Sequence, residues 1–143
     1  MAGKPKILVA REVFPEVLER LRQHFEVDDN QADVVLGVQG LKERLADKVG
    51  ALTAVSDPVT AEVISAAPQL RAICNFAVGY NNIDLAACTR AGIMATNTPG
   101  VLDDTTADFA WALILATARR LNEAEAYVRQ GKWDKWRLKQ FLG

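Results

Sequence analysis

A glycine turn between two apolar runs is the part of this sequence best suited to ligand chemistry. The run 71–76 ends in Ala77-Val78-Gly79, and a second run, 93–96, ends in Asn97-Thr98-Pro99-Gly100. Free backbone N–H groups in such a turn can bind a carboxylate, because glycine has no side chain to keep the ligand away. From the residues alone, the turn is either an anion-binding loop or a plain connection between a strand and a helix.

Two polar residues follow another apolar run, 51–55, and could face the same cleft. Ser56 is a candidate substrate contact, although it can equally belong to the turn before the next helix. Asp57 follows the third strand, as the phosphorylated aspartate of a receiver domain does. Such a site also needs acidic residues after the first strand and a lysine after the fifth, where this chain has Arg11-Glu12 and Thr98-Pro99-Gly100. We therefore exclude the receiver function.

Five short apolar runs alternate with helix-sized segments over the first hundred residues. The first, 7–10, is continuously apolar, as expected for a strand covered by helices on both faces. Alternation of this kind predicts an α/β protein with a flavodoxin-like, five-stranded parallel sheet in the order 2-1-3-4-5. The loops after the carboxyl ends of such strands are where small ligands bind. The predicted strands are 7–10, 26–28, 51–55, 71–76 and 93–96.

Several helix ends are marked in the sequence. Pro15 suits the first turn of a helix that carries apolar residues up to Phe25, with the single histidine, His24, on its surface near the end. A small amphipathic helix is expected over 41–49. Thr60 can cap the helix that follows it, Asn81 and Asp84 resemble a capping box, and Gly92 can end that helix.

The segment from Thr105 to Gln130 contains no proline or glycine and predicts one long C-terminal helix. At 1.5 Å per residue it would be about 39 Å long. Thr105 and Asp108 can form a capping box, and Gly131 can end the helix. Residues 109–116 are apolar all round, so this half of the helix must be buried on every side.

The composition is that of an ordinary globular protein. The chain has 143 residues, of which half are apolar and about a quarter charged, and a net charge of −1. Neither a nucleic-acid nor a membrane partner is indicated, and no signal peptide precedes the first strand, so we expect a cytoplasmic protein. Cys74 and Cys88 lack the spacing of a zinc site and are expected to be buried thiols, and we expect no metal site.

Three ordered motifs carry a resemblance to a known family. Val78-Gly79-Tyr80-Asn81-Asn82-Ile83-Asp84, Thr96-Asn97-Thr98-Pro99-Gly100-Val101-Leu102 and Thr106-Ala107-Asp108 resemble the N-terminal part of the D-isomer-specific 2-hydroxyacid dehydrogenases. Within that family the glyoxylate/hydroxypyruvate reductases are most similar. The likeness runs from about Lys6 to Gly143. Asn81 stands where the family usually has aspartate, a change that preserves the turn chemistry.

The resemblance implies an NAD(P)H-dependent oxidoreductase that reduces a small 2-keto acid, glyoxylate or hydroxypyruvate, to the D-2-hydroxy acid. Ala77, Val78 and Gly79 would then bind the substrate carboxylate, with Ser56 as a further substrate contact. Leu102 and Thr106 would approach the nicotinamide of NAD or NADP, although Thr106 can also be a plain first-turn residue. The helix Thr105–Gln130 would form a homodimer. In the tail after it, Trp133, Trp136 and Phe141 either reach a neighbouring active site or clasp two domains together.

The family's dinucleotide fingerprint should follow a Phe-Leu-Gly such as Phe141-Leu142-Gly143, but no G-x-G-x-x-G occurs in these residues. The family's catalytic Arg, Glu and His lie beyond that fingerprint. We therefore expect a substrate-binding domain over 1–102, an interdomain and dimerisation helix with its tail over 103–143, no nucleotide-binding domain and no catalytic residue. Such a chain would neither bind NAD(P) nor reduce a keto acid by itself.

A stand-alone, non-catalytic binding or oligomerisation module is the alternative function. Whether the gene continues past Gly143 separates the two hypotheses. The sequence leaves open which keto acid is reduced, whether NAD or NADP is used, how the end at Gly143 arises, and whether the long helix is exchanged between subunits.

Overall fold

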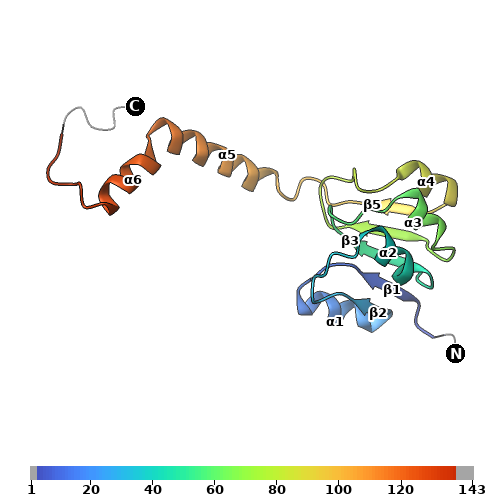
Figure 1. Cartoon of the computed structure of the whole chain (residues 1–143). Coiled ribbons are helices and arrows are strands. Elements are labelled where there is room, and N and C mark those ends of the chain that lie inside the picture. Colours follow the sequence, from blue (N-terminus) through green and yellow to red (C-terminus); the bar gives the residue numbers. More distant parts are fainter. Residues whose placement is uncertain (1–2, 138–143) are drawn as a thin grey trace. The chain divides into compact units, whose positions relative to one another are not determined.

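The computed structural model describes residues 3–137, so Phe141 and the rest of 138–143 lie outside the described residues. The chain divides into two compact units, residues 1–100 and 101–143. The first unit contains β1 (Lys6–Val9), α1 (Pro15–His24), β2 (Glu26–Asp29), α2 (Gly37–Leu45), β3 (Gly50–Thr53), α3 (Ala61–Ser65), β4 (Ala72–Asn75), α4 (Leu85–Ala91) and β5 (Met94–Thr96). The second contains α5 (Asp103–Ala118) and α6 (Leu121–Arg129) (Figure 1).

The five strands form one parallel sheet in the order β2-β1-β3-β4-β5, which confirms the predicted topology. Leu52 in β3 pairs with Val9 on one side and with Cys74 on the other, and Cys74 pairs with Thr96 in β5. With this register, the carboxyl ends of β1, β3, β4 and β5 meet at one edge of the sheet. The loops that carry the candidate residues begin at this edge.

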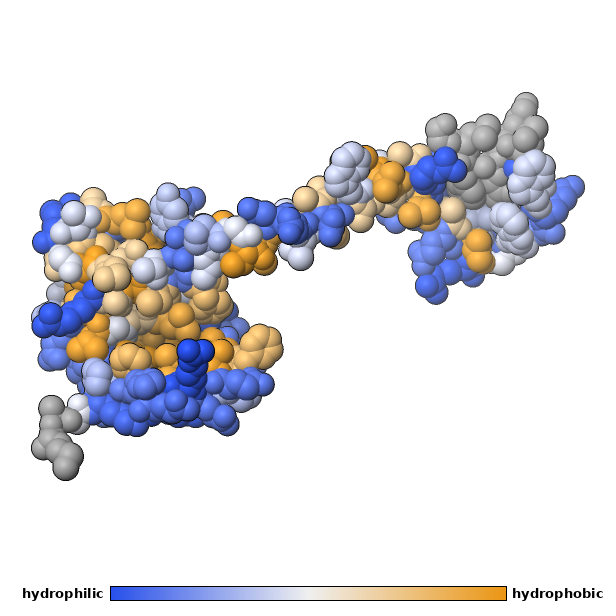
Figure 2. Space-filling model, turned by 180° about the vertical axis from the view of Figure 1, so that it is seen from behind, coloured by the Kyte–Doolittle hydropathy of each residue, from blue (hydrophilic) through white to orange (hydrophobic). Residues whose placement is uncertain are grey.

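Helices α2, α3 and α4 pack against one face of the sheet and enclose the main core (Figure 1). This core contains large side chains with no exposed surface: Leu8, Leu41, Leu45, Val63 and Ile73. Because side chains alternate along a strand, Leu52 and Cys74 point to the opposite face. There α1 packs near β2, while Cys74, Phe76 and Met94 remain exposed, and hydrophobic surface gathers on the first unit (Figure 2).

The expectation that both thiols are buried is therefore wrong for Cys74, although it is confirmed for Cys88. The apolar run that contains Cys74 does predict a strand. Burial on the second face, however, requires a covering helix, and among the described residues α1 does not extend over β4 and β5. A continuous apolar run alone cannot indicate which faces are covered within this chain.

Most of the expected helix ends are confirmed. Pro15 is the first residue of α1, the Thr60 hydroxyl accepts a hydrogen bond from the Val63 amide at 3.4 Å, and Gly92 ends α4 in the left-handed conformation. The cap of α4 is Asp84, whose carboxylate accepts from the Ala87 amide at 2.8 Å, and not Asn81. The amphipathic helix α2 begins at Gly37, four residues earlier than expected.

The expected single helix from Thr105 to Gln130 is wrong. It is broken after Ala118, and Arg120 adopts a left-handed backbone conformation with φ 51° and ψ 41°. The Arg120 guanidinium pairs with Glu123 in the first turn of α6. No proline or glycine marks the break, so the sequence pattern gives no sign of it. Gly131, also left-handed, lies just past the end of α6 as expected.

The start of α5 also differs from the expected capping box. The helix begins at Asp103, and the Thr105 hydroxyl donates to the Leu102 carbonyl oxygen at 3.0 Å instead of capping an amide. The apolar side chains of α5 are exposed within this unit, including Phe109 at 65% and Trp111 at 64%. Among residues 3–137, no helix has the length and apolar character needed to cross a membrane.

Candidate functional site

The loop that follows β4 lies at the carboxyl edge of the sheet and contains Ala77, Val78 and Gly79. Pairing with β3 continues for one residue past β4, because the Phe76 amide donates to the Thr53 carbonyl oxygen at 2.9 Å. The loop then leaves the sheet, and it rejoins the fold where the Asn82 carbonyl oxygen accepts from the Val59 amide at 2.8 Å. Its first residues therefore start from a fixed strand end.

Three consecutive carbonyl groups of this loop accept hydrogen bonds. The Ala77 oxygen accepts from the Thr98 amide at 3.0 Å, and the Val78 oxygen accepts from the side-chain Nδ2 of Asn97 at 2.8 Å. The Gly79 oxygen accepts from Nδ2 of Asn75 at 2.9 Å. The loop is thus held from two sides, by the end of β4 and by the segment after β5.

The amides of the same three residues have no hydrogen-bond acceptor among residues 3–137. In a planar trans peptide, the N–H points away from the C=O of the preceding residue. The fixed Ala77 and Val78 carbonyls therefore direct the amides of Val78 and Gly79 away from Thr98 and Asn97. Unpaired, exposed backbone donors in a turn are suited to binding an anion.

Gly79 contributes open space to this loop, not an unusual backbone conformation. Its φ lies outside the left-handed region, in which the chain places Gly37, Gly92, Gly100 and Gly131. A Cβ atom built on Gly79 would have no neighbouring atom within 4 Å. Gly79 thus does not use the positive φ open to glycine, and the absence of a side chain leaves the approach to the amides clear.

A buried amide network holds the base of the loop. Asn75, with 1% of its surface exposed, forms a reciprocal pair with Asn82 through two hydrogen bonds of 3.3 Å. The Thr53 hydroxyl donates to the Asn75 side-chain oxygen at 3.0 Å. Nδ2 of Asn82 lies 3.0 Å from the carbonyl oxygens of Ala54 and Asp57. The network therefore joins the turn after β3 to the loop after β4.

Ser56 is exposed in this joined turn, on the same sheet edge as the glycine loop. The neighbouring Asp57 is fully buried, and its Oδ2 accepts from the Ala54 amide at 2.8 Å. Its Oδ1 has no hydrogen-bond partner among the described residues. Burial raises the pKa of Asp57, while the Ala54 hydrogen bond and the positive charge of Arg11 act in the opposite direction. The hydrogen bond between Asp57 and Ala54 holds the turn together, and Ser56 lies exposed within that turn.

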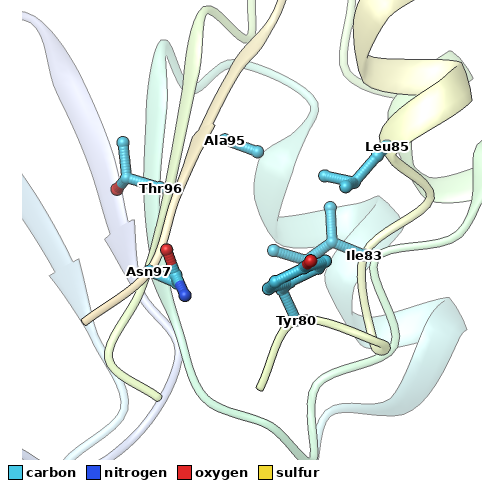
Figure 3. Close-up of a pocket in the computed structure, with 6 residues that line it drawn as sticks. All are labelled: Tyr80, Ile83, Leu85, Ala95, Thr96 and Asn97. Carbon is cyan, nitrogen blue, oxygen red and sulfur yellow. The ribbon is translucent and has the colours of Figure 1, made fainter. Parts of the chain in front are cut away.

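A small pocket of about 140 Å³ lies between the glycine loop and β5. Figure 3 shows Tyr80, Ile83 and Leu85 on one side of it and Ala95, Thr96 and Asn97 on the other. It is smaller than the usual volume of a ligand site, roughly 300–1,000 Å³. Asn97 lines this pocket and also donates to the Val78 carbonyl oxygen, so one side chain forms part of the pocket wall and holds the loop in place.

The expected cofactor contacts, Leu102 and Thr106, belong to the second unit. Leu102 precedes α5 and is 54% exposed, and its carbonyl oxygen accepts from the Thr106 amide at 2.9 Å. Asp103 and Asp104 occupy the same first turn. Two carboxylates there oppose the binding of phosphate groups, so this turn suits an uncharged part of a cofactor.

The family model for the catalytic domain of D-isomer specific 2-hydroxyacid dehydrogenases matches residues 7–131. The chain belongs to this family. A glyoxylate reductase of Korarchaeum cryptofilum is 45% identical over 141 residues, which are 98% of this chain and 42% of that protein. The chain thus spans less than half the length of this relative.

Solved structures of longer proteins contain the same fold. One, a protein from Thermus thermophilus, has a TM-score of 0.83 and 38% identity over 96% of this chain and 44% of its own. Another is an NADPH-dependent glyoxylate/hydroxypyruvate reductase from Sinorhizobium meliloti, in complex with NADP and malonate. It has a TM-score of 0.71 and 36% identity over 92% of this chain and 40% of its own.

Three asparagines of this chain were not predicted as site residues: Asn75, Asn82 and Asn97. A signal was present for Asn75, because a polar amide that ends a buried apolar strand needs hydrogen-bond partners. Its partners come from β3, from the loop after β4 and from the segment before α4, which the sequence pattern does not place together. Asn97 holds Val78 across 19 positions of sequence and had no local signal.

Proposed function

We propose that this chain is the substrate-binding part of an NAD(P)H-dependent dehydrogenase that reduces glyoxylate or hydroxypyruvate to the D-2-hydroxy acid. The observation that carries the proposal is the loop with three occupied carbonyls and three unpaired amides at Ala77, Val78 and Gly79. The likeness to glyoxylate reductases supports the choice of substrate class.

In this proposal the substrate carboxylate accepts hydrogen bonds from the amides of Val78 and Gly79, with Ala77 beside them. Fixing the carboxylate in two places orients the neighbouring keto group, which is the requirement for a directed hydride transfer. Ser56, exposed on the same sheet edge, is proposed as a further contact to the substrate. The malonate complex of the Sinorhizobium relative is consistent with a carboxylate ligand in this family.

The nicotinamide cofactor supplies the hydride when it is bound. Within this chain, Leu102 and Thr106 are the proposed contacts, through an apolar side chain and a hydroxyl at the exposed start of α5. The aspartates of that turn do not suit the cofactor's phosphates, so we propose that the phosphates and the proton-transfer groups are held outside these 143 residues. NAD and NADP both remain compatible with this chain.

The exposed apolar side chains of α5 support a proposed homodimer through residues 105–130. Exposed apolar surface of this size usually marks an interface. The side chains concerned are Phe109, Trp111, Leu113, Ile114 and Leu115, each between 52% and 65% exposed within the described residues. The same surface favours the second candidate function, an oligomerisation module.

Titration of the ¹⁵N-labelled chain with oxalate tests the proposed substrate site. Oxalate resembles the keto acid in size and carries two carboxylates. We expect saturable shifts of the Val78 and Gly79 amide resonances, with smaller changes at the similarly exposed amide of Asn81. Equal, non-saturating shifts across the loop would contradict the carboxylate site, as would a crystal soaked with oxalate in which the ligand lies elsewhere.

A further inference from the structure

We infer that Asn97 is a positioning residue, which binds the Val78 carbonyl and so aims the Gly79 amide at a carboxylate, and that Asn75 supports it by anchoring the next carbonyl of the loop, that of Gly79. This inference rests on the proposed function, since it assigns a role to residues around the same site. Neither asparagine needs to touch the substrate. Each acts through a backbone group of the loop.

The two asparagines hold successive carbonyls from different parts of the fold. Asn97 follows β5 and donates to the Val78 oxygen at 2.8 Å, whereas Asn75 ends β4 and donates to the Gly79 oxygen at 2.9 Å. The Thr98 amide completes the set by donating to Ala77. The Asn97 bond thus fixes the peptide plane between Val78 and Gly79, while the Thr98 and Asn75 bonds fix the planes before and after it.

Rotation of this plane would exchange the positions of its carbonyl and its amide. The carbonyl oxygen would then face the carboxylate. The attraction between the N–H and the carboxylate would be replaced by repulsion between two negatively charged oxygens. A loop whose carbonyls are unheld can populate both orientations, so only a fraction of its molecules can bind the anion. Asn97 therefore preorganises the Gly79 amide directly, and Asn75 supports it by fixing the next peptide of the loop, so the effect of each residue appears in ligand affinity.

The two positions differ in what else depends on them. Asn75 is buried and also bonds Asn82 and Thr53, so its removal disturbs the base of the loop and the fold around it. The side chain of Asn97 makes its hydrogen bond with Val78 and no other among the described residues. Asn97→Ala is therefore the decisive variant, and Asn75→Ala is the second.

Asn81 offers a matched control in the same loop. It is exposed, and its side chain makes no hydrogen bond to any described residue. Asn81→Ala removes the same atoms as Asn97→Ala, and Asn81 has no part in the proposed binding site. A difference between these two variants therefore reports the hydrogen bond to Val78 and not the loss of an amide side chain in general.

The experiment measures the dissociation constant of oxalate by amide NMR, together with the melting temperature, for the full chain and the three variants. We expect Asn97→Ala to weaken oxalate about fivefold to tenfold, the factor that corresponds to one hydrogen bond. Its melting temperature should stay within about 2 °C of the parent, as for a surface substitution. Asn81→Ala should change neither quantity, and Asn75→Ala should lower both affinity and melting temperature.

The possible outcomes separate this inference from the proposed function. Oxalate binding by the parent chain with equal affinity in Asn97→Ala overturns the positioning role and leaves the carboxylate site in place. An absence of binding by the parent chain contradicts the carboxylate site instead. In that case a crystal structure of Asn97→Ala decides, because an unchanged Val78–Gly79 peptide plane overturns the inference, and a rotated or split plane supports it.

Discussion

The side-chain amide of Asn75 donates a hydrogen bond of 2.9 Å to the carbonyl oxygen of Gly79, four residues further along the chain. This bond closes the strand end back onto the loop that begins there. Asn75 also pairs with Asn82, which holds the turn after β3. The two candidate substrate segments, 54–57 and 76–80, therefore share one buried anchor.

Substitution of Gly79 should separate stability from binding. A Cβ atom at this position has no neighbour within 4 Å, and the backbone φ is not left-handed. Gly79→Ala should therefore match the parent's free energy of unfolding or exceed it by up to about 1 kcal/mol, because the unfolded chain loses freedom. Gly79→Val should fold as well and bind oxalate at least about tenfold more weakly, since its branched side chain projects beside the Val78 and Gly79 amides.

Urea unfolding and the oxalate titration check these two properties. Unchanged oxalate affinity in Gly79→Val would leave Gly79 as an ordinary turn residue. The same substitution in a full-length enzyme should raise KM for the keto acid much more than KM for the cofactor.

The exposed surface of α5 predicts a two-fold symmetric dimer. Burying five large apolar side chains at roughly 1.5–3 kcal/mol each stabilises the dimer by on the order of 10 kcal/mol before the costs of association. Sedimentation equilibrium should therefore show a dimer at micromolar concentration. Ile114→Asp should give a monomer or an insoluble chain, while Gln69→Glu adds the same charge at an exposed polar position outside residues 105–130 and should remain dimeric. A parent chain that stays monomeric at tens of micromolar would refute the interface.

Asp57 predicts a defined pH dependence of stability. Burial raises the pKa of this carboxyl in the folded chain above its ordinary value of 3.8. Between these two values the folded state binds more protons than the unfolded state, so the contribution of Asp57 to stability falls as pH rises. Asp57→Asn should lack this decline. The free energy of unfolding of the variant should therefore rise relative to that of the parent from about pH 4 upward, until Asp57 is ionised in the folded parent.

Urea unfolding of parent and variant between pH 3 and pH 7 checks this sign. Asp47 acts in a different window, because hydrogen bonds from Lys48 and Lys6 lower its pKa to about 2. Its contribution is present above 3.8 and is lost as pH falls toward 2. A parent-minus-variant difference for Asp57 that does not change with pH above 4 would show that its folded-state pKa is ordinary.

The cap of α3 should be measurable by a single substitution. The Thr60 hydroxyl accepts the Val63 amide, and Val63 is fully buried in the main core. Thr60→Ala should lower the free energy of unfolding by about 1 kcal/mol, the usual cost of losing an N-cap. Thr89→Ala is the matched control, because the exposed Thr89 hydroxyl bonds the Leu85 carbonyl within α4 and caps no amide. Equal effects of the two variants would show that the Thr60 cap contributes nothing of its own.

The purified 143-residue chain should neither reduce glyoxylate nor bind NAD(P)H. Its residues contain no dinucleotide fingerprint, and the first turn of α5 carries Asp103 and Asp104, which oppose phosphate. The absorbance of NAD(P)H and calorimetric titration measure the two properties. Turnover that remains with the chain through successive purification steps would contradict the prediction.

The sequence by itself determined the order of strands and helices in the first unit and the topology of the sheet. Short apolar runs separated by helix-sized segments permit few arrangements, because crossovers between parallel strands have one hand. Pro15, Thr60 and Gly92 marked helix ends through local backbone chemistry, which needs no distant partner. The motifs around Gly79 and Asn97 likewise identified the family, since family motifs are a property of the linear chain.

Only the tertiary structure decided which polar groups meet at the end of the sheet. Two partners of Asn82 lie in the turn after β3 and a third, Asn75, ends β4, and the Val78 carbonyl is held by Asn97 from beyond β5. Hydrogen bonds depend on distances of about 3 Å between atoms, which the spacing of residues along the chain does not encode. The exposure of Cys74 could not be predicted either, because the covering of a sheet face depends on how distant helices pack. The break at Arg120 depends on a left-handed backbone conformation for which no proline or glycine in the sequence gives a sign.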